Sequence, residues 1–137
     1  MKAIILFLFA FTSGRVVEEQ DATVYLFRNP RFFGVIANYN VRLDGEEICK
    51  LSNKRFLKLS LKPGSHHLES YVAGVGYLSK PKTTLDFEIK EGDTYYIETT
   101  AKMKSLSSEL ELLQVNKKRG DELMSKITKF DYCQKRQ

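Results

Sequence analysis

Histidine is scarce in this chain of 137 residues, and tryptophan is absent. The two histidines, His66 and His67, are adjacent in the stretch LKPGSHHLES, and no HExxH motif accompanies them. A zinc site needs three or four converging ligands, whereas neighbouring residues of a strand point to opposite faces of a sheet. If Leu68 faces the core, His66 shares its side and His67 points outward. We therefore expect no metal site, with one nitrogen of His66 hydrogen-bonded at the end of a sheet and His67 in solvent.

Motifs of enzyme active sites are also missing. The chain has no GxSxG, no P-loop and no GxGxxG, and the GVG at Gly74 to Gly76 lacks the remainder of a phosphate-binding loop. The carboxylates Asp86 and Glu88 alternate with apolar residues, as do Glu109 and Glu111. Such alternation is typical of the solvated face of a sheet rather than of acid–base catalysis. The sequence therefore predicts a protein that is not an enzyme, with no catalytic residues and no cofactor.

No apolar run is long enough for a membrane-spanning helix, which needs about 20 residues. The run from Ala3 to Phe11 has nine apolar residues, follows Lys2, and is succeeded by the small residues Thr12 and Gly14. This layout is typical of a secretory signal peptide, and we expect cleavage after Gly14. A buried N-terminal strand or helix is the alternative. The expected organisation is a signal peptide at 1–14, a short segment at 15–21 and one domain at 22–137, in a periplasmic or secreted protein.

Most of the remaining chain alternates polar and apolar residues with a period of two, which predicts strands. ATVYLFR (Ala22 to Arg28) and ELELLQV (Glu109 to Val115) are expected to be the first and last strands. Asp44-Gly45 predicts a tight hairpin, and two further hairpins are expected around Pro63-Gly64 and Glu91-Gly92-Asp93. Short strands without βαβ spacing predict a mainly β fold. We expect an antiparallel β-sandwich, Ig-like or prealbumin-like, of seven or eight strands.

The C-terminal part has a helical pattern instead. Leu123, Met124, Ile127 and Phe130 recur at helical spacing after Asp121, which is a suitable N-cap. We expect a short C-terminal helix whose apolar side packs against a sheet. The connections at 29–38 and 72–82 are longer than tight turns, and such loops are common places for binding sites.

Positive charge is in modest excess, with 22 lysines and arginines against 17 acidic residues. The segment KLSNKRFLKLSLK carries five basic residues and no acid: Lys50, Lys54, Arg55, Lys58 and Lys62. One interpretation is an exposed edge strand whose lysines discourage pairing with other chains. The other is a contact surface for an anionic partner. The sequence leaves both open.

Cysteine occurs twice, as Cys49 after the Asp-Gly pair and Cys133 after the expected helix. An even count in an exported chain favours a disulfide, and a helix folded back on the sandwich could carry Cys133 towards a strand. The alternative is two unpaired thiols. The sequence cannot decide, because a bridge requires Cα atoms within about 7 Å.

The order of several motifs resembles a known bacterial family. VYLFRNPRFFG, VRLDGEEICKL, FLKLSLKPGSHHL, EGDTYYIE and ELELL follow one another between about Ala22 and Cys133. This order resembles the domain of unknown function DUF2846, found in small exported proteins and lipoproteins. The central part is also similar to PEGA-type β-sandwich repeats, with Lys62-Pro63-Gly64 where PPG is common and Cys49 where Gly is common. The resemblance implies an Ig-like or prealbumin-like sandwich and no known activity. The chain lacks the lipid-anchoring cysteine of the lipoprotein members, which argues against a membrane anchor.

These observations lead to an expectation for function. We expect an exported, non-enzymatic module of the cell envelope that binds a protein partner or an anionic surface polymer. Nucleic acid is not expected, because no basic-aromatic motif is present. The alternative is a small ligand carrier or an enzyme, with a pocket between the sheets or under the 72–82 loop. Converging polar groups in a concave site would distinguish the second class from the first.

Overall fold

The computed structural model describes residues 18–30, 38–72, 82–104 and 107–133. The expected signal peptide at 1–14 lies outside the described residues, as do the central parts of the two long connections. Within the described ranges, no helix is long and apolar enough to cross a membrane.

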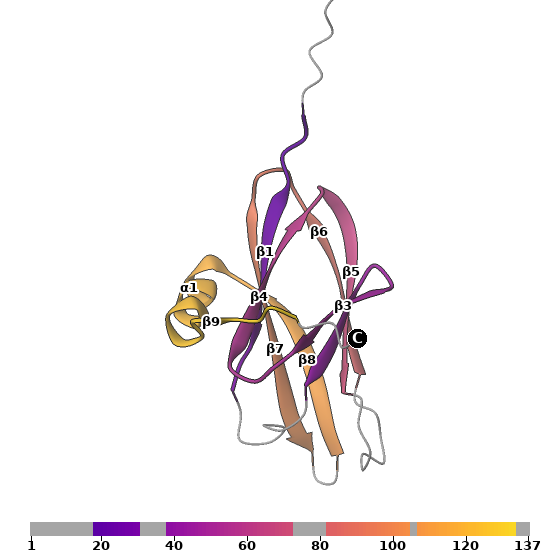
Figure 1. The fold of residues 1–137 in the computed structure, drawn as a ribbon, viewed down its shortest axis with the longest axis vertical. Helices are drawn as coiled ribbons and strands as arrows, with labels where there is room; N and C mark the ends of the chain where they lie inside the picture. Colours follow the sequence, from indigo (N-terminus) through magenta and orange to yellow (C-terminus); the bar gives the residue numbers. More distant parts are fainter. Residues whose placement is uncertain (1–17, 31–37, 73–81, 105–106, 134–137) are drawn as a thin grey trace, which may run out of the picture.

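Nine strands in these ranges form two sheets that face each other (Figure 1). Sheet A has the order β8-β7-β1-β4-β9, and sheet B has the order β3-β2-β5-β6. Sheet A consists of β1 (Ala22–Arg28), β4 (Arg55–Leu61), β7 (Thr94–Lys104), β8 (Ser107–Val115) and the short β9 (Lys129–Phe130). Sheet B consists of β2 (Tyr39–Leu43), β3 (Glu46–Leu51), β5 (Gly64–Val72) and β6 (Lys82–Ile89). The expected β-sandwich with one short helix, α1 (Lys117–Lys126), is confirmed.

Sheet A is mixed, so the expectation of purely antiparallel pairing is wrong for this sheet. Strand β1 runs parallel to β7, with Thr23 opposite Thr94, and β4 runs parallel to β9. A parallel pair requires a crossover connection, and here the chain passes through both sheets between β1 and β7. The alternation of polar and apolar residues shows which side chains face inward, but it carries no information about strand direction.

One of the three expected hairpins is confirmed. Strands β2 and β3 pair antiparallel around Asp44-Gly45, whose φ angles of 50° and 85° suit a two-residue turn. Pro63-Gly64 and Glu91–Asp93 lie between strands of different sheets, because β4 and β7 belong to sheet A whereas β5 and β6 belong to sheet B. These two connections therefore join the layers of the sandwich, and the expectation of hairpins at these positions is wrong.

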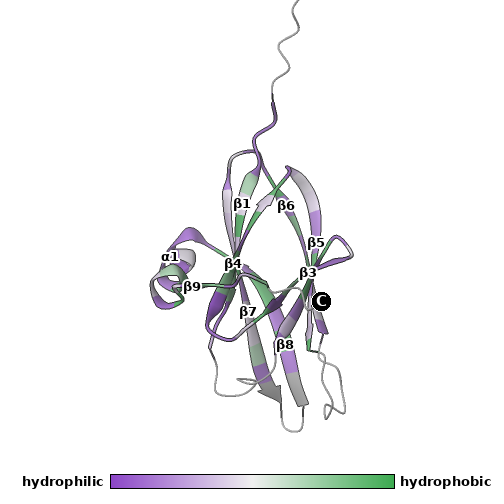
Figure 2. Cartoon of the chain, viewed as in Figure 1, coloured by the Kyte–Doolittle hydropathy of each residue, from purple (hydrophilic) through white to green (hydrophobic). Residues whose placement is uncertain are grey.

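The core between the sheets is built from alternate residues of the strands. Leu57 is buried, and Leu59 and Leu61 pack against the same core from β4, as expected. Leu68 of β5 is 1% exposed, which confirms the inward direction inferred for it. Figure 2 shows the resulting alternation of hydrophobic and hydrophilic residues along the strands. This core fixes which residues of each strand reach the outer faces.

A second, smaller core lies on the outer face of sheet A, where α1 packs (Figure 1). Leu123 and Ile127 are buried there against Phe27 of β1. Gly120 lies directly on the Tyr96 ring, and a Cβ atom at this position would overlap the ring atoms. The close approach of α1 to sheet A therefore requires glycine at this position.

Helix α1 begins earlier than the sequence suggested. Asn116 is the N-cap, and its side-chain oxygen accepts a hydrogen bond from the Arg119 backbone N–H at 2.9 Å. The expected cap at Asp121 is therefore wrong, because an equally suitable cap occurs five residues before it. Met124 is 37% exposed, and Phe130 belongs to β9 rather than to the helix. The apolar side of the helix is thus narrower than the spacing of Leu123, Met124, Ile127 and Phe130 in the sequence indicated.

Candidate functional site

The five basic residues of the Lys50–Lys62 segment are distributed over different parts of the surface. Lys50 alternates with two core residues of β3 and therefore points to the outer face of sheet B. Lys58 alternates with the inward leucines of β4 and points to the outer face of sheet A. Lys54 and Lys62 flank opposite ends of β4, roughly 26 Å apart along an extended strand. Arg55 donates a hydrogen bond to a backbone carbonyl of β9 at 3.1 Å. The segment does not form one continuous patch.

None of these five residues forms an ion pair with a described carboxylate. Other cations of the chain do so: Arg42, Lys82, Lys102, Lys117 and Arg119 each contact an acidic side chain. Strand β4 pairs with β1 on one side. On its other side β9 pairs only with Arg55 and Phe56, so the remaining residues of β4 have no partner strand there in the described ranges. Lys58 of β4 therefore lies on a sheet edge, where it opposes pairing with other chains, and its charge is also available to an anion.

Aromatic rings accompany Lys58 on the outer face of sheet A. Tyr25 and Tyr96 stack with their centroids 5.8 Å apart and their planes at 12°. Phe56 lies 6.2 Å from Tyr25, and all three rings are half-buried. The Lys58 Nζ atom lies 5.8 Å from the centroid of the Tyr25 ring, within the range of a cation–π contact. This face, beside α1, combines flat rings with an ammonium group that has no acidic partner among the described residues.

A shallow hollow of about 470 Å³ lies where β5 and β6 meet the turn between β2 and β3. It is lined by both histidines and by three carboxylates, those of Asp44, Asp86 and Glu88. Strand pairing brings these residues together, because β5 lies between β2 and β6 in sheet B. No local sequence pattern indicates this cluster, since its carboxylates are 19–23 residues away from the histidines and only the strand order makes them neighbours.

Both ring nitrogens of His66 face hydrogen-bond acceptors. Nδ1 lies 2.7 Å from the Asp44 carboxylate, and Nε2 lies 2.7 Å from the Lys62 carbonyl oxygen. A neutral imidazole has a single N–H, so the imidazolium form satisfies this arrangement. Burial lowers the pKa of His66, but the hydrogen bonds to Lys62 and Asp44 together raise it above 6.5. The expectation of one bonded nitrogen is wrong, because the Asp-Gly turn supplies a second partner.

The Asp44 carboxylate holds two neighbouring residues of β5 at once. Oδ1 accepts a hydrogen bond from the His67 backbone N–H at 2.8 Å, while Oδ2 contacts the His66 ring. The His67 hydrogen bond is the main cause that lowers the pKa of Asp44, and the His66 ring adds to it, against the opposing effect of burial. Asp44 therefore fastens the β2–β3 turn to β5.

His67 lies on the outer face, as expected, but it is not simply solvated. Its Nδ1 atom lies 2.5 Å from the Asp86 carboxylate of the neighbouring strand. A carboxylate on one nitrogen can orient a histidine as a general base. In the described part of the chain, however, no hydroxyl or thiol is hydrogen-bonded to either histidine ring. The hollow therefore contains an oriented imidazole without an assembled nucleophile.

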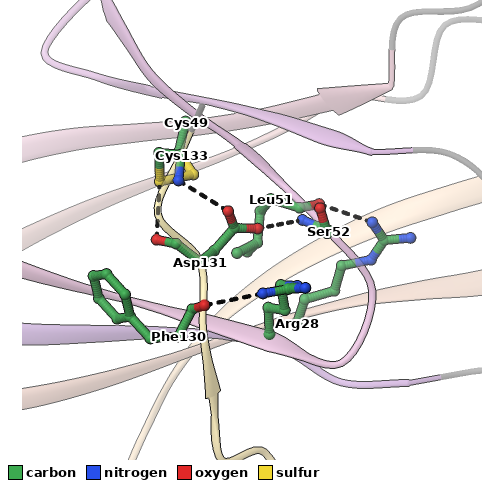
Figure 3. Close-up of a disulfide and its surroundings, with 8 residues drawn as sticks. Arg28, Cys49, Leu51, Ser52, Phe130, Asp131 and Cys133 are labelled. Carbon is green, nitrogen blue, oxygen red and sulfur yellow. Dashed lines mark hydrogen bonds between the residues drawn. A yellow bond between two sulfur atoms is a disulfide. The ribbon is translucent and has the colours of Figure 1, made fainter. Parts of the chain in front are cut away.

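The structure joins Cys49 and Cys133 in a disulfide, with their Cα atoms 4.8 Å apart (Figure 3). Cys49 belongs to β3 of sheet B, and Cys133 follows β9 of sheet A. We call residues 129–133 the β9 clasp, because they pair with one sheet and are covalently bound to the other. The clasp closes the side of the sandwich where β3 and β4 are neighbours.

Asp131 fixes the position of the β9 clasp. Its carboxylate accepts hydrogen bonds from the backbone N–H groups of Ser52 and Cys133, at 2.8 and 2.9 Å (Figure 3). Its own backbone N–H donates to the Phe56 carbonyl at 2.9 Å. The carboxylate lies close to both sulfur atoms, and within the described ranges these three residues form a group that could hold a metal ion.

Comparison with protein families gives a match over residues 18–110, to the family described as "Protein of unknown function (DUF2846)". The matched region is more than half of the chain and includes β1 to β7 and the beginning of β8. The chain belongs to the DUF2846 family. The resemblance recognised in the sequence is thereby confirmed, although the DUF2846 match ends before α1 and the β9 clasp, which we had included. The family description assigns no function, and no curated protein matches the chain.

Proposed function

We propose that this protein is an exported, non-enzymatic β-sandwich module of the bacterial cell envelope that binds an anionic surface polymer. The observation that carries the proposal is the position of Lys58 over the Tyr25 ring, without a carboxylate partner among the described residues. The rings pack partly against the core under α1, and their exposed parts offer apolar contact area beside an ammonium group that attracts negative charge. Of the two partner classes that the sequence left open, a protein or a polymer, this combination favours an anionic polymer.

The row of rings extends the proposed contact face towards the β9 clasp. Phe56 contacts Phe130 at 5.6 Å, and Phe130 contacts Tyr132 at 5.1 Å between centroids. The Tyr132 side chain is 82% exposed. Rings that run from Tyr25 to Tyr132 suit an extended ligand better than a compact one.

Binding at this face would be weak and sensitive to salt. Charges on a protein surface are screened beyond about 8 Å at physiological ionic strength. A lysine beside an anionic surface contributes about 1 kcal/mol. A polymer with repeated negative charges would gain from several such contacts at once.

The proposal is tested with heparin as an anionic polysaccharide probe and dextran as an uncharged control. We expect wild-type protein to bind heparin in low salt, to lose it as salt rises, and to ignore dextran. Lys58→Glu should weaken binding by roughly fivefold to tenfold, corresponding to a loss of about 1 kcal/mol or slightly more. Lys90→Glu, in the connection between β6 and β7, makes the same change of charge and should have a smaller effect. Equal losses in the two variants would show a non-specific charge effect and contradict the proposal.

A further inference from the structure

Three side chains with atoms suited to metal binding meet at the β9 clasp. The sulfur atoms of Cys49 and Cys133 and a carboxylate oxygen of Asp131 all lie within 4.8 Å of one another. Cys49 and Asp131 are 4% and 7% exposed, whereas Cys133 is only half-buried, so water can reach the group from the Cys133 side. In a tetrahedral zinc site, the Zn–S and Zn–O bond lengths place neighbouring ligand atoms about 3.6–3.8 Å apart. Small rotations of the side chains would give this spacing once the sulfur–sulfur bond is absent.

We propose that the Cys49–Cys133 pair has a second, reduced state, in which the two thiolates and the Asp131 carboxylate bind Zn²⁺. A dithiol reductant breaks the sulfur–sulfur bond, gives two electrons and two protons to the cysteines, and is itself oxidised to a disulfide. Zn²⁺ then displaces the two thiol protons, which leave to solvent. Water fills the fourth position of the tetrahedron. The clasp is closed by a covalent bond in one state and by a metal ion in the other.

The ligands stay close together without the disulfide because other contacts hold the clasp. The Asp131 N–H donates to the Phe56 carbonyl, and the Arg55 guanidinium donates to the Phe130 carbonyl. Neither hydrogen bond involves a cysteine. The apolar contact of Phe130 with Phe56 adds to them. Reduction therefore frees the sulfur atoms but leaves β9 paired with β4.

The Asp131 carboxylate is already oriented for this role. Backbone N–H groups of Ser52 and Cys133 donate to its two oxygens, and each oxygen retains a further lone pair for a metal. Hydrogen bonds that orient a metal ligand in this way matter for affinity. Removing them typically weakens metal binding by about 10- to 100-fold. The site thus has both ligands and the contacts that position them.

Cobalt provides the test, because Co²⁺ bound to thiolates gives charge-transfer absorption in the near ultraviolet. The full chain is reduced with a phosphine, which is removed without oxygen before titration with Co²⁺ and then Zn²⁺. We expect one Co²⁺ per chain with thiolate absorption, loss of that absorption as Zn²⁺ displaces Co²⁺, and no absorption in the oxidised protein. Circular dichroism, recorded throughout, shows whether the protein is folded. Zn²⁺ should raise the unfolding temperature of the reduced protein but not that of the oxidised protein.

Variants show whether Co²⁺ binds at a site that includes Asp131 or only to two free thiols. Cys49→Ser should abolish the thiolate absorption, and Asp131→Asn should weaken binding about tenfold or more. Asp93→Asn, an exposed residue in the connection between β6 and β7, is the matched control and should leave the affinity unchanged. Equal affinity in Asp131→Asn and wild type would overturn the proposal. So would a folded reduced protein that binds no Co²⁺, or an unfolded one that Zn²⁺ does not restore.

Discussion

Asp44 of the β2–β3 turn contacts His66 of β5, with a carboxylate oxygen of Asp44 2.7 Å from Nδ1 of His66. The contact ties the β2–β3 turn to β5, and its strength depends on pH because both residues titrate. The pKa of His66 is raised above 6.5 and that of Asp44 is lowered below 3.8. Both groups are charged between these values, so the contact is strongest in that interval.

The first prediction concerns the stability that His66 contributes. A group whose pKa is raised on folding stabilises fully below its unfolded value of about 6.5, and this stabilisation disappears as pH rises through the folded pKa. The difference in unfolding free energy between wild type and His66→Gln should therefore be largest at pH 5–6 and should shrink towards pH 9. We expect about 1 kcal/mol at its maximum, because Asp44 is half exposed.

Denaturant unfolding at several pH values measures this difference, and NMR titration of the His66 ring reports its pKa directly. Ser125→Ala, an exposed position of α1 that carries no titratable side chain, is the control and should keep the pH dependence of the wild type. A His66 pKa at or below 6.5 would contradict the prediction.

The second prediction concerns Gly120. Replacement by alanine would normally stabilise a helix by up to about 1 kcal/mol. Here the added methyl group overlaps the Tyr96 ring, so α1 must move away from sheet A. We expect Gly120→Ala to destabilise the protein by about 1–3 kcal/mol. Ser125→Ala, at an exposed position of the same helix, should have little effect, and a stabilised Gly120→Ala protein would show that the helix does not pack as described.

The third prediction concerns the disulfide. The denatured, unreduced protein should contain no titratable thiols, and two thiols per chain would exclude the bridge. Cys49 and Cys133 are 84 residues apart in sequence. Closing a loop of that length stabilises by about 4–5 kcal/mol in the chain-entropy model, an upper value because residual structure in the unfolded chain reduces it. The double variant Cys49→Ser/Cys133→Ser should therefore unfold at lower denaturant concentration than the oxidised wild type.

The fourth prediction concerns processing of the N-terminus. Nine apolar residues after Lys2 favour export and cleavage after Gly14. Mass spectrometry of the protein from its native host should find a chain that begins at Arg15, in the periplasmic or secreted fraction. An intact Met1 terminus in the cytoplasmic fraction would contradict this expectation.

Local features of the fold could be predicted from the sequence, whereas the relations between distant segments could not. The inward direction of Leu57 and Leu68 follows from alternation alone, and the Asp44-Gly45 hairpin follows from two residues. The parallel pairing of β1 with β7 depends on how the chain crosses between sheets, which no local pattern records. The partners of the histidines depend on strand order for the same reason. The count of cysteines suggested a bridge, but its geometry depends on where β9 lies.

The β9 clasp has a consequence for the order in which the protein can mature. A chain that emerges N-terminus first, from a ribosome or through a membrane, presents Cys49 long before Cys133. Strand β1 likewise cannot complete its pairing until β7 has emerged, because Thr23 pairs opposite Thr94. Pairings between residues so distant in sequence form slowly. Until β9 has paired with β4 and Cys133 has reached Cys49, the β3–β4 side of the sandwich is uncovered and Cys49 is a free thiol. Before the Cys49–Cys133 bond forms, Cys49 can therefore form a disulfide with another molecule, and the uncovered edge strands can pair with another chain.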